Sequence, residues 1–265
     1  MKNLLVALAR ILREDTEFRE VFLEKMLRRT LEEKDVEEVI NSPTYFWPFF
    51  TGLPYNGPLD WPKNGETMTS LQNLLFLKDV CEDVHMKKIE GDIVETGLWR
   101  GGCLIYMKLC FNFFKDFRIA HGFDSFIGCP TPDIQTEKDK SIESSALQCR
   151  WNEHFTVSKQ EVEQNFLKYG IKREEFNLIE GWFHETVPVA KIDHISILRL
   201  DGDCYSSTEI VLDNLYEKVS VGGYIIIDDF DLECCALAVE DFRKRNEITT
   251  PITYKDGGVG YWLKE

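Results

Sequence analysis

Three carboxylates, those of Asp201, Asp228 and Asp229, stand directly after two short apolar runs of the chain. The runs cover residues 195–200 and 224–227, and both are typical of buried β-strands. If the strands are parallel neighbours, the acids meet at the carboxyl-terminal edge of one sheet, where open α/β sheets bind ligands. Because unpaired buried carboxylates are costly, we expect a divalent cation between them. The pattern predicts a metal site in an enzyme.

The elements that must position these acids alternate between helical and strand patterns. Helices are expected between strand-like runs at residues 92–95, 118–124, 176–179, 195–200 and 224–227. This alternation is typical of βαβ units and a parallel sheet. Two late strand-like segments, 252–254 and 259–263, indicate an antiparallel addition at one edge. We therefore expect an α/β, Rossmann-like fold with a mostly parallel sheet and an antiparallel edge strand.

Capping patterns predict where two of the helices begin. Ser158 with Glu161 opens a helix that reaches about residue 169, and residues 206–209 open the helix between the last two parallel strands. The Val-Gly-Gly segment 221–223 is expected to end that helix before the next strand begins. The charged run 137–140 is expected to be a solvated loop.

Residues 1–64 differ in character from residues 65–265, and we expect two domains divided there. The first part contains two charged amphipathic helices and then a Pro-, Gly- and aromatic-rich stretch, residues 42–62, that excludes regular structure. We expect an arm or lid that packs on the core, covers the acceptor or reaches across a dimer. Residues 65–265 are expected to form the catalytic domain.

Composition limits the partners of the chain. A net charge of −15 in 265 residues argues against nucleic acid and anionic membranes, because both need a basic surface. The apolar run near the amino terminus is too short to span a bilayer, so we expect a cytoplasmic protein. The eight cysteines are scattered without a Cys-x-x-Cys motif, which favours buried thiols over a disulfide framework.

A glycine turn, residues 91–102, supplies a second candidate site. It joins a strand to a helix without the G-x-G-x-x-G pattern of dinucleotide sites, and it carries Glu95 at the strand end. A carboxylate inside the turn suits a cationic ligand better than a phosphate. Asp124 ends the next strand, where such sheets bind ribose hydroxyls. Together these features predict S-adenosylmethionine, whose sulfonium and ammonium groups are cationic.

These motifs also resemble the macrocin O-methyltransferase family, which comprises metal-dependent sugar O-methyltransferases of macrolide and aminocoumarin pathways. The resemblance covers roughly residues 65–263, with the motifs in family order. It rests on segments 91–102, 124–126, 155–158, 181–183, 198–208 and 219–229. It implies a class I S-adenosylmethionine-dependent methyltransferase fold, a sugar-containing or other small-molecule hydroxyl acceptor, and a homo-oligomer.

The resemblance also implies roles for individual residues. Asp201, Asp228 and Asp229 become Mg²⁺ ligands. The residues implied to bind the cofactor are Met68, Thr69, Glu95, Thr96, Gly97, Arg100, Gly101, Asp124, Ser125, Gly181, Trp182 and Asp201. Of these, residues 95–101 would line its methionine end, Asp124 and Ser125 its ribose, and Gly181 and Trp182 its adenine.

The chemistry of methyl transfer to a hydroxyl requires a base as well as a metal. An alcohol has a pKa far above neutral, and Mg²⁺ would stabilise the alkoxide that develops as the proton leaves. Asp203, just beyond the strand end, is the expected catalytic base, with Asp201 and His154 as rivals.

Two other functions remain open. Asp201-Gly202-Asp203 also fits the D-x-D motif of metal-dependent nucleotide-sugar glycosyltransferases, although that leaves Glu95, Asp228 and Asp229 without roles. A non-catalytic relative that only binds the cofactor is the second alternative, and the intact set of costly acids argues against it.

Overall fold

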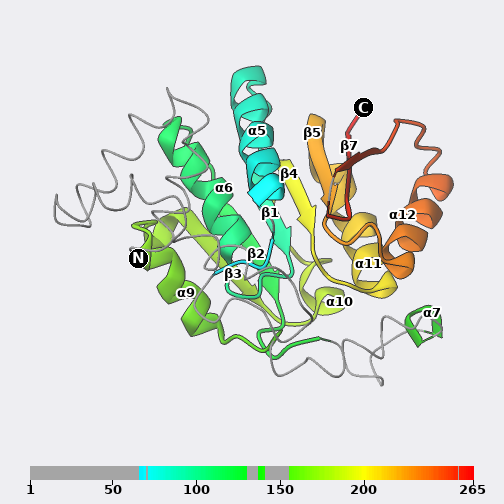
Figure 1. Cartoon of the computed structure of the whole chain (residues 1–265), viewed down its shortest axis with the longest axis horizontal. Coiled ribbons are helices and arrows are strands. Elements are labelled where there is room, and N and C mark those ends of the chain that lie inside the picture. The colour runs from blue at the N-terminus through cyan, green and yellow to red at the C-terminus, as the bar shows by residue number, and fades with distance from the viewer. Residues whose placement is uncertain (1–65, 70, 130–136, 141–154, 256) are drawn as a thin grey trace. The chain divides into compact units, whose positions relative to one another are not determined.

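A computed structural model describes residues 66–69, 71–129, 137–140, 155–255 and 257–265 (Figure 1). The chain forms two compact units, Met1–Leu77 and Lys78–Glu265. The second unit contains the sheet and, among the described residues, every predicted site residue except Met68 and Thr69. The whole predicted amino-terminal arm, and His154, lie outside the described residues. The predicted division at residues 64 and 65 stays a prediction.

A seven-stranded sheet, in the order β3-β2-β1-β4-β5-β7-β6, organises the second unit. Its strands are β1 (Asp92–Thr96), β2 (Ala120–Asp124), β3 (Phe176–Glu180), β4 (Ile195–Leu200), β5 (Val219–Ile227), β6 (Thr253–Lys255) and β7 (Val259–Leu263). Strands β1 to β5 pair in parallel, whereas β7 runs antiparallel to both β5 and β6. The predicted mostly parallel sheet with an antiparallel edge is confirmed.

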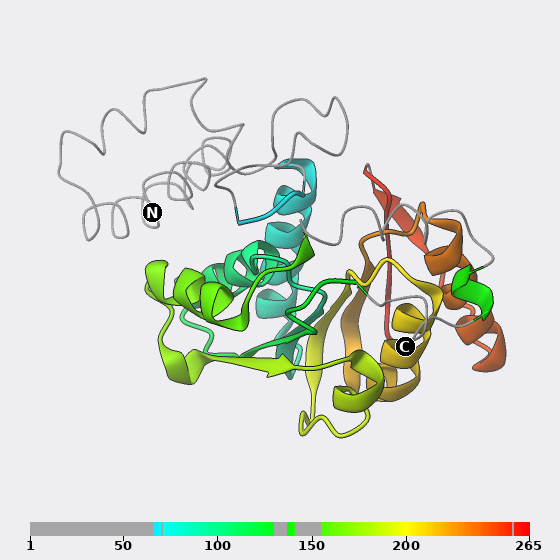
Figure 2. The same ribbon diagram turned by 90° about the horizontal axis from the view of Figure 1, so that it is seen from below.

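Helices cover both faces of this sheet. They are α5 (Leu71–Lys87), α6 (Gly102–Phe113), α7 (Glu137–Lys140), α9 (Lys159–Lys168), α10 (Phe183–Thr186), α11 (Tyr205–Leu215) and α12 (Glu233–Arg245), with 3₁₀ turns at Arg173–Glu175 and Tyr216–Lys218. Helices α6 and α9 lie on one face, and α10, α11 and α12 on the other (Figures 1 and 2). Every residue of β4 is therefore buried, which explains its nearly continuous apolar sequence. No helix among the described residues is long and apolar enough to cross a membrane.

The capping prediction is confirmed for one helix and wrong for another. The Ser158 hydroxyl accepts the Glu161 N–H at 3.2 Å, as expected. Helix α11, however, begins at Tyr205 with Cys204 as an N-cap that makes no side-chain cap bond. The predicted stop at residues 221–223 is also wrong, because these residues lie inside β5. The glycines lie in an irregularity of the pairing with β4, because Ile195 pairs with Val219 and Ile197 already pairs with Tyr224.

The charged run 137–140 is a helix, not the solvated loop that we expected. Asp139 in α7 is buried, and its Oδ1 accepts the Ser206 N–H of α11 at 3.0 Å. Lys138 donates to the Tyr205 hydroxyl at 2.5 Å. The segment after β2 thus supplies, from a distant part of the chain, a cap that the start of α11 lacks locally.

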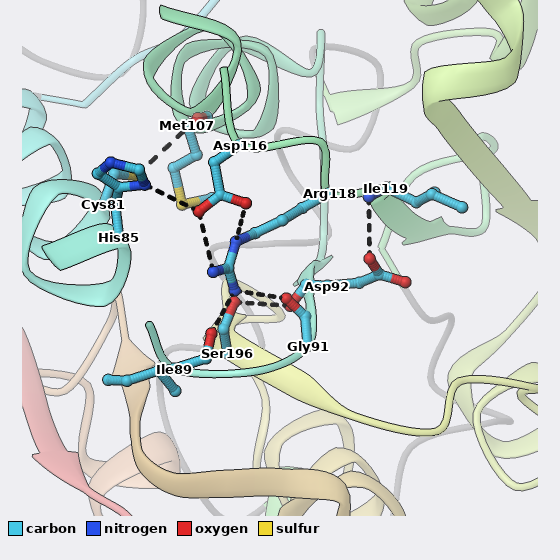
Figure 3. Close-up of polar contacts among 10 residues, drawn as sticks. All are labelled: Cys81, His85, Ile89, Gly91, Asp92, Met107, Asp116, Arg118, Ile119 and Ser196. Atoms are coloured by element: carbon cyan, nitrogen blue, oxygen red, sulfur yellow. Dashed lines mark hydrogen bonds and ion pairs between the residues drawn. The ribbon is translucent and has the colours of Figure 1, made fainter. Parts of the chain in front are cut away.

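A second polar cluster lies at the amino-terminal ends of the strands (Figure 3). Arg118 donates to the carbonyl oxygens of Ile89 at 2.6 Å and Gly91 at 2.7 Å. Its other nitrogens bind both carboxylate oxygens of Asp116, and His85 Nδ1 lies 3.0 Å from Asp116 Oδ2. This cluster joins the loop before β1 to the loop before β2, on the edge opposite the predicted site.

Candidate functional site

The carboxyl ends of β1, β4 and β5 meet at one edge of the sheet. Thr96 pairs with Leu200, which pairs with Ile227. Past the strand ends, the Asp201 N–H donates to Thr96 O at 2.8 Å and the Asp228 N–H to Leu200 O at 2.9 Å. The prediction that the acids after β4 and β5 gather at this edge is confirmed.

The glycine turn after β1 packs directly on the end of β4. Gly97 has φ +87°, and a Cβ atom there would lie 1.7 Å from the carbonyl oxygen of Asp201. Gly101 also has a left-handed φ, 82°, and forms the N-cap of α6. Trp99 takes φ 48°, an unfavourable value for a bulky residue, and the Arg100 guanidinium lies 4.3 Å from its ring centroid. The turn is thus held in a strained shape that glycine makes possible at the closest contact.

The ends of β2 and β3 lie beside this turn. Asp124 Oδ2 accepts the Leu98 N–H and Oδ1 accepts the Phe126 N–H, both at 2.7 Å. The Gly181 N–H donates to Asp124 O at 3.0 Å, which brings Gly181 and its neighbour Trp182 to the same edge. Asp124 therefore fixes the turn through its carboxylate.

Ser125 follows Asp124 in a tight turn of its own. Its hydroxyl donates to Gly128 O at 2.6 Å and accepts the Ile127 N–H at 3.2 Å. The structure thus brings the residues predicted for the ribose and the adenine to one edge, next to those predicted for the methionine end. Met68 and Thr69 lie in the first unit, and their predicted role stays a prediction.

A buried arginine that the sequence analysis did not single out joins the glycine turn to the acids. Arg199 of β4 is 1% exposed. Its Nη1 donates to Glu95 Oε1 and, at 2.7 Å, to Asp201 Oδ2, while Nη2 lies 2.5 Å from Asp228 Oδ1. One guanidinium therefore contacts three carboxylates from three adjacent strands. A charged residue inside the buried run 195–200, two positions before Asp201 and hence on the same face, was the available signal.

Among the described residues, Asp201, Asp203 and Asp229 offer one carboxylate oxygen each, all within 4.8 Å of one another. This set differs from the predicted ligands because it includes Asp203 and leaves Asp228 paired with Arg199. Asp229 Oδ2 is buried without a hydrogen-bond partner among the described residues. Hard oxygen donors with an unpaired buried lone pair fit Mg²⁺ or another hard cation. The predicted ligand set itself stays a prediction.

The close spacing and burial of the acids raise their pKa values. Burial, together with the charges of Asp201 and Asp228, raises the pKa of Glu95 to about 8, although Arg199 acts to lower it. Burial likewise raises the pKa of Asp228 to about 6. The pKa values of Asp201, Asp203 and Asp229 are also raised, mainly by burial. One arginine does not compensate five acids, so a bound cation would relieve their repulsion.

The cofactor half of the site offers an unpaired acceptor of its own. Glu95 is 1% exposed, and its Oε2 has no hydrogen-bond partner in the described part of the chain. A buried carboxylate oxygen left over beside a glycine turn suits an ammonium or sulfonium group. The residues present therefore fit the methionine end of S-adenosylmethionine.

Solved structures place the fold among class I methyltransferases. The structure of the O-methyltransferase NovP superposes with a TM-score of 0.72 and 37% sequence identity, over 77% of this chain and 84% of that one. The calicheamicin methyltransferase CalS11 gives a TM-score of 0.61 over 95% of this chain and 93% of that one, at 19% identity. The predicted fold is confirmed.

Sequence comparisons then establish the family. The profile of the Macrocin-O-methyltransferase (TylF) family matches residues 13–264. Demethyldecarbamoylnovobiocin O-methyltransferase of Streptomyces niveus is 40% identical over 77% of this chain and 78% of its own length. Mycinamicin III 3''-O-methyltransferase of Micromonospora griseorubida is 32% identical over 77% and 81%. The chain belongs to the macrocin O-methyltransferase family and is an O-methyltransferase, which confirms the resemblance and argues against the glycosyltransferase alternative.

Proposed function

We propose that this protein transfers the methyl group of S-adenosylmethionine to a hydroxyl of a sugar-containing natural product, in a reaction that depends on Mg²⁺. The observation that carries the proposal is the arrangement around Arg199. A cofactor-facing carboxylate, Glu95, and a cluster of acids suited to a cation share one guanidinium at one sheet edge. A methyl group carried by a positively charged sulfonium and a metal-bound hydroxyl would have to meet in that arrangement.

In the proposed complex, the glycine turn holds the methionine end of the cofactor. Glu95 Oε2 is placed to accept from the ammonium group, while its Oε1 is held by Arg199. The remaining contacts proposed for Thr96, Gly97, Arg100 and Gly101 follow from their position in the same turn. Asp124 and Ser125 would meet the ribose, Gly181 and Trp182 the adenine, and Met68 and Thr69 the outer side of the cofactor.

In the proposed metal site, Asp201, Asp228 and Asp229 hold Mg²⁺. Asp229 carries the unpaired oxygen, and Asp228 keeps its second oxygen for the ion while Oδ1 remains on Arg199. When bound, S-adenosylmethionine supplies the methyl group and Mg²⁺ lowers the pKa of the acceptor hydroxyl.

Asp203 is proposed to take the proton of that hydroxyl. It belongs to the cluster with Asp201 and Asp229, and its backbone has a left-handed φ of 55°. Burial and neighbouring acids raise the pKa of Asp203, and a more basic carboxylate is a better proton acceptor near neutral pH. Asp201 is the alternative base within the described residues.

The acceptor is proposed from the relatives, which are named as O-methyltransferases of demethyldecarbamoylnovobiocin, of a rhamnosyl-tetracenomycin and of mycinamicin III. A homo-oligomer and a cytoplasmic location remain further parts of the proposal.

The test is a methyl-transfer assay with radiolabelled S-adenosylmethionine and demethyldecarbamoylnovobiocin as the first acceptor, followed by a panel of unmethylated glycosides and of the corresponding aglycones. We expect label in at least one glycoside, abolished by EDTA and restored by Mg²⁺. Equal methyl transfer in the presence and absence of EDTA would contradict the proposed dependence on Mg²⁺. Label that enters only acceptors without a sugar would contradict a sugar-containing acceptor.

A further inference from the structure

The buried guanidinium of Arg199 has contacts that extend beyond a single ion pair. Its Nη1 is shared by Glu95 of β1 and Asp201 after β4, and its Nη2 contacts Asp228 after β5. Arg199 and Glu95 are also direct neighbours in the register of the two strands. The contacts therefore run across three adjacent strands through one planar group.

Each contact fixes one oxygen of a carboxylate and leaves the other for a ligand. Glu95 uses Oε1, so its buried Oε2 stays available. Asp201 uses Oδ2 and Asp228 uses Oδ1, which leaves one oxygen of each for a cation. Without the guanidinium, three carboxylates within a few ångströms would repel one another and turn apart.

We propose that Arg199 is a positioning residue shared by the two halves of the site, which orients Glu95 toward the cofactor and Asp201 and Asp228 toward the cation. This inference rests on the proposed function. It goes further because it makes both binding events depend on a side chain that touches neither ligand. Groups that orient metal ligands typically affect metal affinity by about 10–100-fold when they are changed.

The decisive variant is Arg199→Lys, which keeps the positive charge and removes the planar guanidinium group. A lysine ammonium is a single point on a flexible stem and cannot hold three carboxylates in one plane. We expect the Kd of S-adenosylhomocysteine and the Kd of Mg²⁺, each measured by calorimetry, to rise together by at least about tenfold.

Arg118→Lys is the matched control. Arg118 is also largely buried, at 9% exposure, and also binds a carboxylate and two further acceptors, but at the opposite edge of the sheet (Figure 3). A merely structural role predicts that both lysine variants lower the melting temperature and leave both affinities unchanged. The proposal predicts that Arg199→Lys alone changes the two affinities.

Glu95→Gln tests the proposal if Arg199→Lys does not fold. Glu95 is outside the proposed metal ligands, yet it binds one side of the guanidinium. Above pH 8, where the wild-type Glu95 with its pKa of about 8 is ionised, a neutral amide there leaves the arginine charge on Asp201 and Asp228, where it competes with the cation. We expect the Kd of Mg²⁺ to rise by about tenfold in this variant, and an unchanged Kd would overturn the proposal.

The outcomes separate this inference from the proposed function. If the wild-type protein binds neither S-adenosylhomocysteine nor Mg²⁺, both the function and the inference fall. If the wild type binds both and a folded Arg199→Lys variant binds both equally well, only the inference falls.

Discussion

Gly97 and the carbonyl of Asp201 are in closer contact than any residue with a side chain would allow. A Cβ atom at Gly97 would stand 1.7 Å from Asp201 O, and the glycine also needs φ +87°. The glycine turn and the first proposed metal ligand are therefore in direct backbone contact. The proposed cofactor site and the proposed cation site are therefore coupled through a contact between backbone atoms.

Gly97→Ala should consequently damage the fold and the site together. We expect a loss of more than about 3 kcal/mol in the free energy of unfolding, from the left-handed conformation plus the steric overlap. Gly170→Ala is the control, because Gly170 has φ +75° and, apart from its chain neighbours, no atom of the described residues lies within 4 Å of its Cβ position. Chemical denaturation should show a loss of only about 1–2 kcal/mol there. Equal losses in the two variants would contradict the close contact.

Asp203→Asn should remove the proposed base while keeping the backbone, since asparagine tolerates left-handed φ values well. We expect kcat to fall by about 10²–10⁴-fold. The Kd of S-adenosylhomocysteine should remain that of the wild type, because Asp203 lies outside the glycine turn. A variant with unchanged kcat would assign the proton transfer to Asp201 or another group.

Glu95 should make the stability of the ligand-free protein depend on pH. Burial raises its pKa from 4.5 to about 8, so folding favours the protonated form. The resulting stabilisation is present below the pKa of the unfolded chain and is lost as the pH rises through the folded value. Between about pH 5 and pH 8, the free energy of unfolding should fall more steeply in the wild type than in Glu95→Gln. Parallel curves from denaturant titrations would show that Glu95 has an ordinary pKa.

Asp139 should stabilise the start of α11 from its place in α7. Asp139→Ala is expected to cost about 1 kcal/mol, because the Ser206 N–H loses its acceptor. Asp139→Asn should cost less, since the amide oxygen can still accept that bond. Thermal unfolding of the two variants would compare them, and equal stability of Asp139→Ala and the wild type would show that the contact contributes nothing.

The sequence predicted most of the sheet and the place of the acids because both follow from local patterns. The runs 195–200 and 224–227 are apolar since both sheet faces are covered, and an acid after each run marks the strand end. Asp124 was placed at the end of β2 by the same rule. The confirmed predictions are those in which burial and the spacing of apolar residues along the chain determine the structure.

The predictions that failed concern contacts between distant segments. Ser206 has the local pattern of a helix cap, but its N–H is bound by Asp139, 67 residues earlier. The local pattern of Gly222 and Gly223 predicts a stop, yet backbone hydrogen bonds with Lys264, which follows β7, hold them in the strand. The pairing of Asp228 with Arg199 likewise depends on three strands meeting in space. Periodicity along one segment contains no information on such contacts.

The most direct test of the proposed site is calorimetric titration of the protein with Mg²⁺, in the presence of S-adenosylhomocysteine, for the wild type and Asp201→Asn. The proposed metal site predicts one saturable Mg²⁺ binding event in the wild type, with a Kd at least about tenfold weaker in Asp201→Asn. The same Kd in both proteins, or no Mg²⁺ binding to the wild type, would contradict a metal site built on the acids at the ends of β4 and β5.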